Sequence, residues 1–137
     1  MTGETAAAAV SRLGLENDQV IQEFGWDEDT DEQFRAAAQE AIGAELEDEG
    51  YTGVVDHVLL WWRAGDGDLT DALVDSIGTL EDGGSILLLT PCPGRPEEVD
   101  PTEVEEASST AGLHTSGTTK CGQDWICTRL VSPKSPR

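Results

Sequence analysis

Residues 57–91 (HVLLWWRAGDGDLTDALVDSIGTLEDGGSILLLTP) predict a strand, a helix and a second strand in succession. The run Val54–Trp62 is almost continuously apolar and rich in β-branched and aromatic residues, which is typical of a strand covered on both faces. Ser85–Thr90 is a second short apolar run, and Pro91 ends it. About 15 helical residues lie between the two runs, a length typical of a crossover, so we expect the two strands to be parallel.

The helix between these strands has its own start and stop signals. Asp68 ends a turn rich in Gly and Asp, where its side chain can cap the helix N-terminus. Apolar residues at helical spacing run from Leu69 to Leu80, and Gly83-Gly84 is the expected end because glycine readily adopts the left-handed C-cap conformation. A buried helical segment is the alternative for residues 55–62, but the paired valines and paired tryptophans favour a strand.

The flanking segments continue the alternation of strands and helices. Val20–Trp26 has the composition of a strand, and the acidic residues after it open a helix for which Thr30 is the expected N-cap. Asp100-Pro101 is an N-cap followed by proline at the first helical position, and Gly112 ends that helix.

The C-terminal part predicts a hairpin, because His114–Cys121 and Trp125–Ser132 are strand-like runs around a short turn. The complete order is then β, α, β, α, β, α, β, β. It predicts an α/β fold: a three-layer Rossmann-like sandwich with a mainly parallel five-stranded sheet and a C-terminal antiparallel hairpin. We expect one domain over residues 11–132, a flexible N-terminus over 1–10 and a tail over 133–137.

The chain carries a formal net charge of −20 over 137 residues. Residues 1–94 hold 21 acidic and 3 basic side chains, whereas residues 107–137 hold 4 basic side chains and 1 acidic one. Such a field repels phosphate backbones, so we expect no nucleic-acid partner. Two explanations of the acidity stay open, namely solubility in a crowded or salty cytoplasm and an acidic face for a basic partner protein.

No apolar run approaches the ~20 residues that a membrane-spanning helix requires. The N-terminus lacks the basic and apolar regions of a signal peptide, and the 3 cysteines match no disulfide framework. These features predict a cytoplasmic protein without a membrane partner.

Several short words of the sequence together resemble the bacterial family called domain of unknown function 3052. They are Gly25-Trp26-Asp27, Leu59-Leu60-Trp61-Trp62-Arg63, Gly65-Asp66-Gly67-Asp68-Leu69, Leu88-Leu89-Thr90-Pro91, Gly94-Arg95-Pro96 and Trp125 followed by Thr128-Arg129-Leu130-Val131. The resemblance covers residues 11–134 and implies no particular activity. The cysteines lie outside the family pattern, so inferences from them concern this chain alone.

The order of elements is also similar to the class I methyltransferase version of the Rossmann fold with strands removed. In that comparison Val20–Trp26 matches the first strand, 55–62 the fourth and 85–90 the fifth. A cofactor site of that fold needs a glycine-rich turn after the first strand, so that the backbone can approach the ligand. Here Gly25 is followed by Trp26 and three acidic residues, and the second strand, whose terminal acid would hold a ribose, is missing. We therefore predict no cofactor, with S-adenosylmethionine or a dinucleotide as the alternative.

Ligands of open parallel sheets bind at the carboxyl ends of the strands. The predicted topology brings aromatic and cationic residues to this edge, namely Trp26, Trp61, Trp62, Arg63, Arg95 and Trp125, with Lys120 beside them. Because Trp and Arg are common in interface hot spots, the edge is a candidate site for a ligand or a partner protein. The alternative is that the tryptophans cap the core, with Trp61 and Trp62 pointing to opposite faces.

Cys92, Cys121 and Cys127 are expected at the same edge. Cys121 and Cys127 would face each other across the hairpin, which allows a reversible disulfide and hence a thiol redox switch. A soft-metal site with Asp124 as a fourth ligand is a second interpretation, but the sequence has no CxxC spacing and we predict no metal. Plain buried or surface cysteines are the third.

The sequence contains no recognisable catalytic set, and His57 and His114 are interpreted as satisfied residues at strand starts. We expect a non-catalytic regulatory or protein-interaction module that binds a protein partner or associates with itself. A small-molecule-binding or enzymatic module that uses the same edge is the first alternative. The thiol switch is the second.

Overall fold

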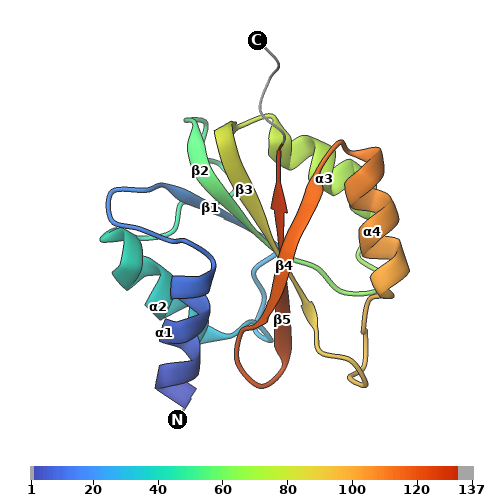
Figure 1. Ribbon diagram of the computed structural model, residues 1–137, viewed down its shortest axis with the longest axis horizontal. Helices are drawn as coiled ribbons and strands as arrows, with labels where there is room; N and C mark the ends of the chain where they lie inside the picture. Colours follow the sequence, from blue (N-terminus) through green and yellow to red (C-terminus); the bar gives the residue numbers. More distant parts are fainter. Residues whose placement is uncertain (1, 133–137) are drawn as a thin grey trace.

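The computed structural model describes residues 2–132 and places five strands between two layers of helices (Figure 1). The strands are β1 (Ile21–Phe24), β2 (Val55–Trp61), β3 (Leu80–Pro91), β4 (His114–Lys120) and β5 (Trp125–Val131), in the spatial order β1-β2-β3-β5-β4. β1, β2 and β3 are parallel neighbours, and β5 pairs antiparallel with both β3 and β4. The predicted α/β sandwich with a closing hairpin is confirmed, and its sheet is mixed.

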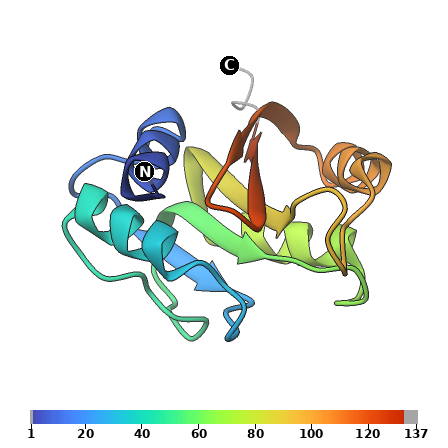
Figure 2. The ribbon, with the colours of Figure 1, turned by 90° about the horizontal axis from the view of Figure 1, so that it is seen from below.

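Two helices cover each face of the sheet (Figure 2). They are α1 (Thr2–Arg12) and α2 (Glu32–Ile42) on one face, and α3 (Leu69–Ile77) and α4 (Pro101–Thr110) on the other. Strand β2 alternates between the two cores, since Leu59 and Trp61 pack toward α1 and α2 whereas Val58 and Leu60 pack toward α3 and α4. Burial on both faces explains why this strand is almost continuously apolar.

The second strand of the methyltransferase-like fold is reduced here to a single bridge. After α2 the chain returns along the outer side of β1, where Glu47 pairs in parallel with Gln22. The Glu47 N–H donates to the Ile21 carbonyl at 2.8 Å, and the Glu23 N–H donates to the Glu47 carbonyl at 2.9 Å. The chain then crosses to β2 on the other side of β1. The prediction that this strand is missing therefore holds except for one residue.

The predicted boundary between α3 and β3 is wrong. α3 ends at Ile77 with Gly78 as its C-cap, and β3 already begins at Leu80, so Gly83-Gly84 lies inside the strand. Leu80 pairs with Val55 before the register between β2 and β3 shifts. Leu80, which the apolar spacing had assigned to the helix, thus belongs to β3 because it pairs with β2.

The caps of the other helices are mostly as predicted. Asp68 and Asp100 cap α3 and α4 through their side chains. In α2 the N-cap is Asp31 rather than Thr30, because the Asp31 carboxylate accepts a hydrogen bond from the Phe34 N–H at 2.9 Å.

The expectation of a flexible N-terminus over residues 1–10 is wrong for residues 2–10. They belong to α1, and Ala9 and Val10 are buried in the core beside α2. The segment is rich in alanine, which favours helices but gives a weak apolar signal. Residue 1 and the predicted tail at 133–137 lie outside the described residues.

His57 is buried near the start of β2, and both of its ring nitrogens have hydrogen-bond partners, as predicted. Its Nδ1 is 2.6 Å from Ser85 Oγ, and its Nε2 is 3.0 Å from Gln19 Oε1. Burial lowers the pKa of His57 from 6.5 to about 4; the nearby Arg129 adds to the lowering, whereas Asp56 opposes it.

The protein should therefore lose stability in acid, because the unfolded chain takes up a proton at His57 that the folded chain excludes. This contribution is complete above pH 6.5 and is lost as the pH falls to about 4. His57→Gln should reduce the loss of unfolding free energy between neutral pH and about pH 4 by about 3 kcal/mol, measured by urea denaturation. His114→Gln, at an exposed strand position, is the control. Identical pH dependence in wild type and His57→Gln would contradict the expectation.

Candidate functional site

The carboxyl ends of β1 and β2 lie at the point where the chain changes direction across the sheet. The helix after β1 (α2) packs on one face, and the helix after β2 (α3) packs on the other (Figure 2). Open α/β sheets bind ligands in the crevice at such a switch point. This edge is therefore the expected position of a ligand-binding site.

Arg63 follows β2 and fastens the loop that follows β1. Its side chain is 10% exposed; Nε and Nη2 donate to the two carboxylate oxygens of Asp29 at 3.0 and 2.6 Å, and Nη1 donates to the Gly25 carbonyl at 2.9 Å. Its guanidinium also lies 5.3 Å from the ring centre of Trp125, within the range of a cation–π contact. The hydrogen bonds with Asp29 raise the pKa of Arg63 and lower the pKa of Asp29, so both groups stay charged.

Gly25 provides the close contact between this loop and β2. Its φ is 79°, and a Cβ at this position would collide with the carbonyl oxygen of Trp61. Its N–H donates to Glu49 Oε2 at 3.1 Å. The glycine thus lets two parts of the chain pack on each other.

Glu23 on β1 is a buried carboxylate with a complete set of internal partners. It is 7% exposed and accepts two hydrogen bonds from Arg35, at 2.6 and 2.7 Å, and one from the Trp61 indole N–H at 2.8 Å. This pairing makes it a structural group rather than a free acid or base. Sequence reasoning missed it, although a carboxylate inside a short, buried strand was a signal.

Three of the four tryptophans are buried at this edge. Trp61 and Trp125 are in edge-to-face contact with ring centres 4.9 Å apart, and Trp62 packs into the opposite core beside α3. The core-capping alternative therefore describes these three, including the opposite directions of Trp61 and Trp62. Only Trp26 offers a large aromatic surface, with 51% of the residue exposed.

Trp26 is held in place although it is exposed. Its indole N–H donates to Glu32 Oε2 at 3.1 Å, and the Arg35 guanidinium lies 5.9 Å from its ring centre. Arg95, by contrast, forms an ion pair with Asp124 at 3.0 Å in which both side chains are about half exposed, 50% and 52%. The six predicted edge residues therefore fall into two groups. Two are exposed, Trp26 and Arg95, and four are buried, namely Trp61, Trp62, Arg63 and Trp125.

The structure brings the cysteines to the expected edge as free thiols. Cys121 and Cys127 are fully buried at the base of the hairpin; burial raises the pKa of Cys127 well above its usual value, with a hydrogen bond to Cys121 as a further cause. Burial also raises the pKa of Cys92. Because the thiolate is the reactive form, these environments disfavour the redox-switch interpretation.

Over residues 2–132, no group of three or more His, Cys, Asp or Glu side chains is arranged to hold a metal ion. None of the helices in that range is long and apolar enough to cross a membrane.

A groove of about 380 Å³ lies at the switch point on the side of α3. Its apolar walls include Leu60 and Trp62, and the carboxylates of Glu49, Asp66 and Asp75 lie around them. The groove is near the lower limit of the volumes that small-molecule pockets have.

Solved structures that share this fold include several methyltransferases. Precorrin-6y C5,15-methyltransferase from Geobacter metallireducens has a TM-score of 0.63 and 14% identity, over 96% of this chain and 88% of that chain. The pyocyanin biosynthetic protein PhzM has a TM-score of 0.70 and 11% identity, over 95% of this chain and 55% of its own. The riboflavin-derivative dimethyltransferase RosA from Streptomyces davawensis has a TM-score of 0.65 and 14% identity, over 96% of this chain and 55% of its own. The class is thus a methyltransferase-like α/β protein, and at these identities the likeness concerns the fold alone.

Residues 10–134 match the family described as Protein of unknown function (DUF3052), and the chain belongs to this family. Uncharacterized proteins of Mycobacterium bovis and Mycobacterium tuberculosis are each 50% identical to it over 139 residues, which cover 97% of this chain and 87% of each relative. The resemblance carried by the short sequence words is confirmed.

The two arginines of this edge should differ sharply in their contribution to stability. Arg63→Ala removes hydrogen bonds from the Gly25 carbonyl and the Asp29 carboxylate and should lower the free energy of unfolding by about 2 kcal/mol. Arg95→Ala is the matched control, because its exposed ion pair should contribute less than about 0.5 kcal/mol. Urea denaturation measures both, and equal losses would show that Arg63 does not fasten the loop.

Proposed function

We propose that this protein is a non-catalytic regulatory or protein-interaction module on a methyltransferase-like scaffold. The observation that carries the proposal is the closed loop after β1: Arg63 bonds to Asp29 and Gly25, and Gly25 packs on the Trp61 carbonyl. That fold holds a cofactor by the backbone of a glycine-rich turn after its first strand, whereas the loop after β1 has Gly25 as its one glycine before α2. The carboxylate of Glu23 is likewise neutralised by Arg35.

The partner chemistry follows from the exposed part of the same loop. Trp26 is a fixed aromatic surface, and the residues after it, Asp27 to Glu32, carry five carboxylates of which two pair with Arg63 and Arg35. An anchored Trp is typical of interface hot spots, and an acidic surround favours a basic partner. We infer a protein partner with a basic contact segment, another copy of this chain included. A cytoplasmic location fits the free thiols.

Trp26→Ala should weaken binding of the partner at least about tenfold, because it removes the aromatic anchor while leaving the buried tryptophans intact. Val74→Ala is a matched control, since Val74 on α3 is also 51% exposed but lies away from the loop. The measurement is quantitative recovery of bound proteins from the native cell with each variant as bait. Equal recovery by the two variants would remove Trp26 from the proposed interface.

A small-molecule-binding module is the second candidate, and the groove of about 380 Å³ beside Trp62 favours it. Under the first proposal, S-adenosylmethionine should leave the thermal midpoint unchanged. A bound ligand at roughly ten times its Kd would raise the midpoint by about 4 °C. Ala72→Phe fills the groove from α3 and is the control. Stabilisation of wild type but not of Ala72→Phe would favour the second candidate over the first.

A further inference from the structure

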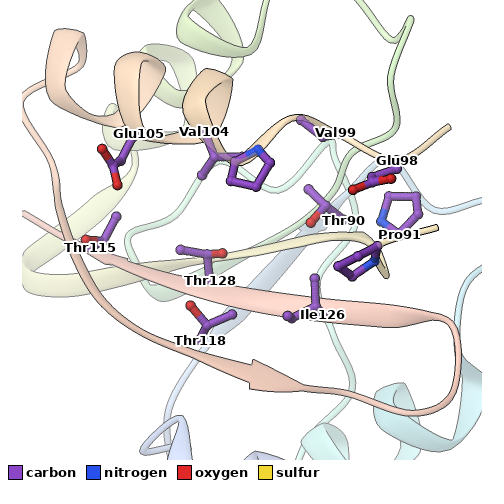
Figure 3. A pocket seen from close by; sticks show the side chains of 12 residues that line it. Thr90, Pro91, Glu98, Val99, Val104, Glu105, Thr115, Thr118, Ile126 and Thr128 are labelled. Atoms are coloured by element: carbon purple, nitrogen blue, oxygen red, sulfur yellow. The ribbon is translucent and has the colours of Figure 1, made fainter. Parts of the chain in front are cut away.

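A separate pocket lies between α4 and the C-terminal hairpin (Figure 3). Its volume is about 310 Å³. Thr90 and Pro91 at the end of β3 form one side, Val104 and Glu105 of α4 form another, and the hairpin closes it from below in Figure 3 with Thr118, Ile126 and Thr128. None of the residues predicted for the edge site lines it.

The pocket exists because α4 covers only one end of the hairpin. Along β5, Ile126, Thr128 and Leu130 lie on the face that points to α4. Leu130 is fully buried under the helix, whereas Ile126 and Thr128 remain half-buried. Thr118 is the cross-strand partner of Thr128, so hydroxyls gather where the helix leaves the sheet uncovered.

Three threonine hydroxyls in this pocket make no hydrogen bonds within the described part of the chain. Among residues 2–132, no group makes a hydrogen bond with the side-chain hydroxyls of Thr90, Thr118 or Thr128. Thr90 as a residue is only 5% exposed, but its hydroxyl oxygen stays accessible from the pocket, because among the described residues the buried side-chain atom without a partner is Arg129 Nε. A ligand would therefore find free donors and acceptors without displacing internal bonds.

The charge of the lining is negative. Glu98 and Glu105 are the ionisable residues among the described lining groups, and no lysine, arginine or histidine stands with them. One oxygen of Glu98 accepts a hydrogen bond from the Gly94 N–H at 3.0 Å, and Glu105 has no ion pair within residues 2–132. The buried Val99 and Val104 add an apolar wall. Carboxylates beside an apolar wall favour an organic cation and disfavour anions.

We propose that this pocket binds a small organic cation, an amine on a compact apolar body, with its ammonium group near Glu105 and its body against Val104 and Ile126. Glu98, at the opposite end of the pocket in Figure 3, adds to the negative charge around it. The volume admits a bicyclic aromatic amine but no folded partner. Binding here is independent of the proposed interface at Trp26, which lies on a different loop.

The test uses tryptamine as the probe and follows backbone amide shifts in the NMR spectrum of the full chain. Tryptamine should shift the amides of Thr118, Thr128 and Glu105 with a Kd on the order of 1 mM or below. Indole-3-acetate, which has the same ring and the opposite charge, should not bind, and neither should methylamine, which lacks the apolar body. Equal binding of the acid and the amine, shifts confined to other regions, or no binding of tryptamine would overturn the proposal.

Variants locate the cation. Glu105→Gln should weaken tryptamine binding about threefold, whereas Glu106→Gln, an exposed residue on the same helix outside this pocket, should have no effect. Thr118→Phe, at an exposed strand position, should block the pocket without disturbing the core. Equal effects of the two glutamate variants would show that tryptamine binding depends only on general surface charge. That result would contradict the placement of the cation near Glu105.

Discussion

The ion pair between Arg63 and Asp29 fixes the packing of the chain at the switch point of this sheet. It joins the loop after β1 to the end of β2, and the same guanidinium holds the Gly25 carbonyl and lies beside Trp125. A bidentate charge-assisted pair with one well-buried partner is among the stronger polar contacts in proteins. It makes the inner side of this loop part of the fold, while Trp26 on the same loop stays exposed.

Burial on both faces of β2 explains why paired tryptophans at a strand end do not by themselves indicate how exposed their rings are. Successive residues of a strand point to opposite sides, so Trp61 and Trp62 enter different cores, one beside α2 and one beside α3. Their position at the strand end made them candidates for a pocket, but the sequence does not say how much of each ring the following loop covers. That coverage depends on tertiary packing, here on Gly25 and Arg63.

The order of elements could be predicted because strands buried on both faces and Asp-capped helices leave clear local patterns. The family followed from short words of sequence. The end of α3 could not be predicted, since Leu80 suits a helix stripe locally and is taken into β3 by pairing with Val55. The Glu23–Arg35 pair joins β1 to α2 across 12 residues, and the Arg63–Asp29 pair joins residues 34 apart, so no local pattern indicates either.

Two separate reductions of the fold, the lost second strand and the short helix α4, accompany the closed edge and the pocket under α4. With the second strand reduced to the bridge at Glu47, little chain remains on the outer side of β1, and the loop after β1 packs inward on β2. At the other end of the sheet, the ten-residue helix α4 covers Leu130 but not Thr128. A small α/β protein buries a smaller fraction of its surface than a large one. In this chain the uncovered part of the hairpin carries threonine hydroxyls beside Ile126, and the proposed preference of the pocket for cations follows from the carboxylates of Glu98 and Glu105 around it.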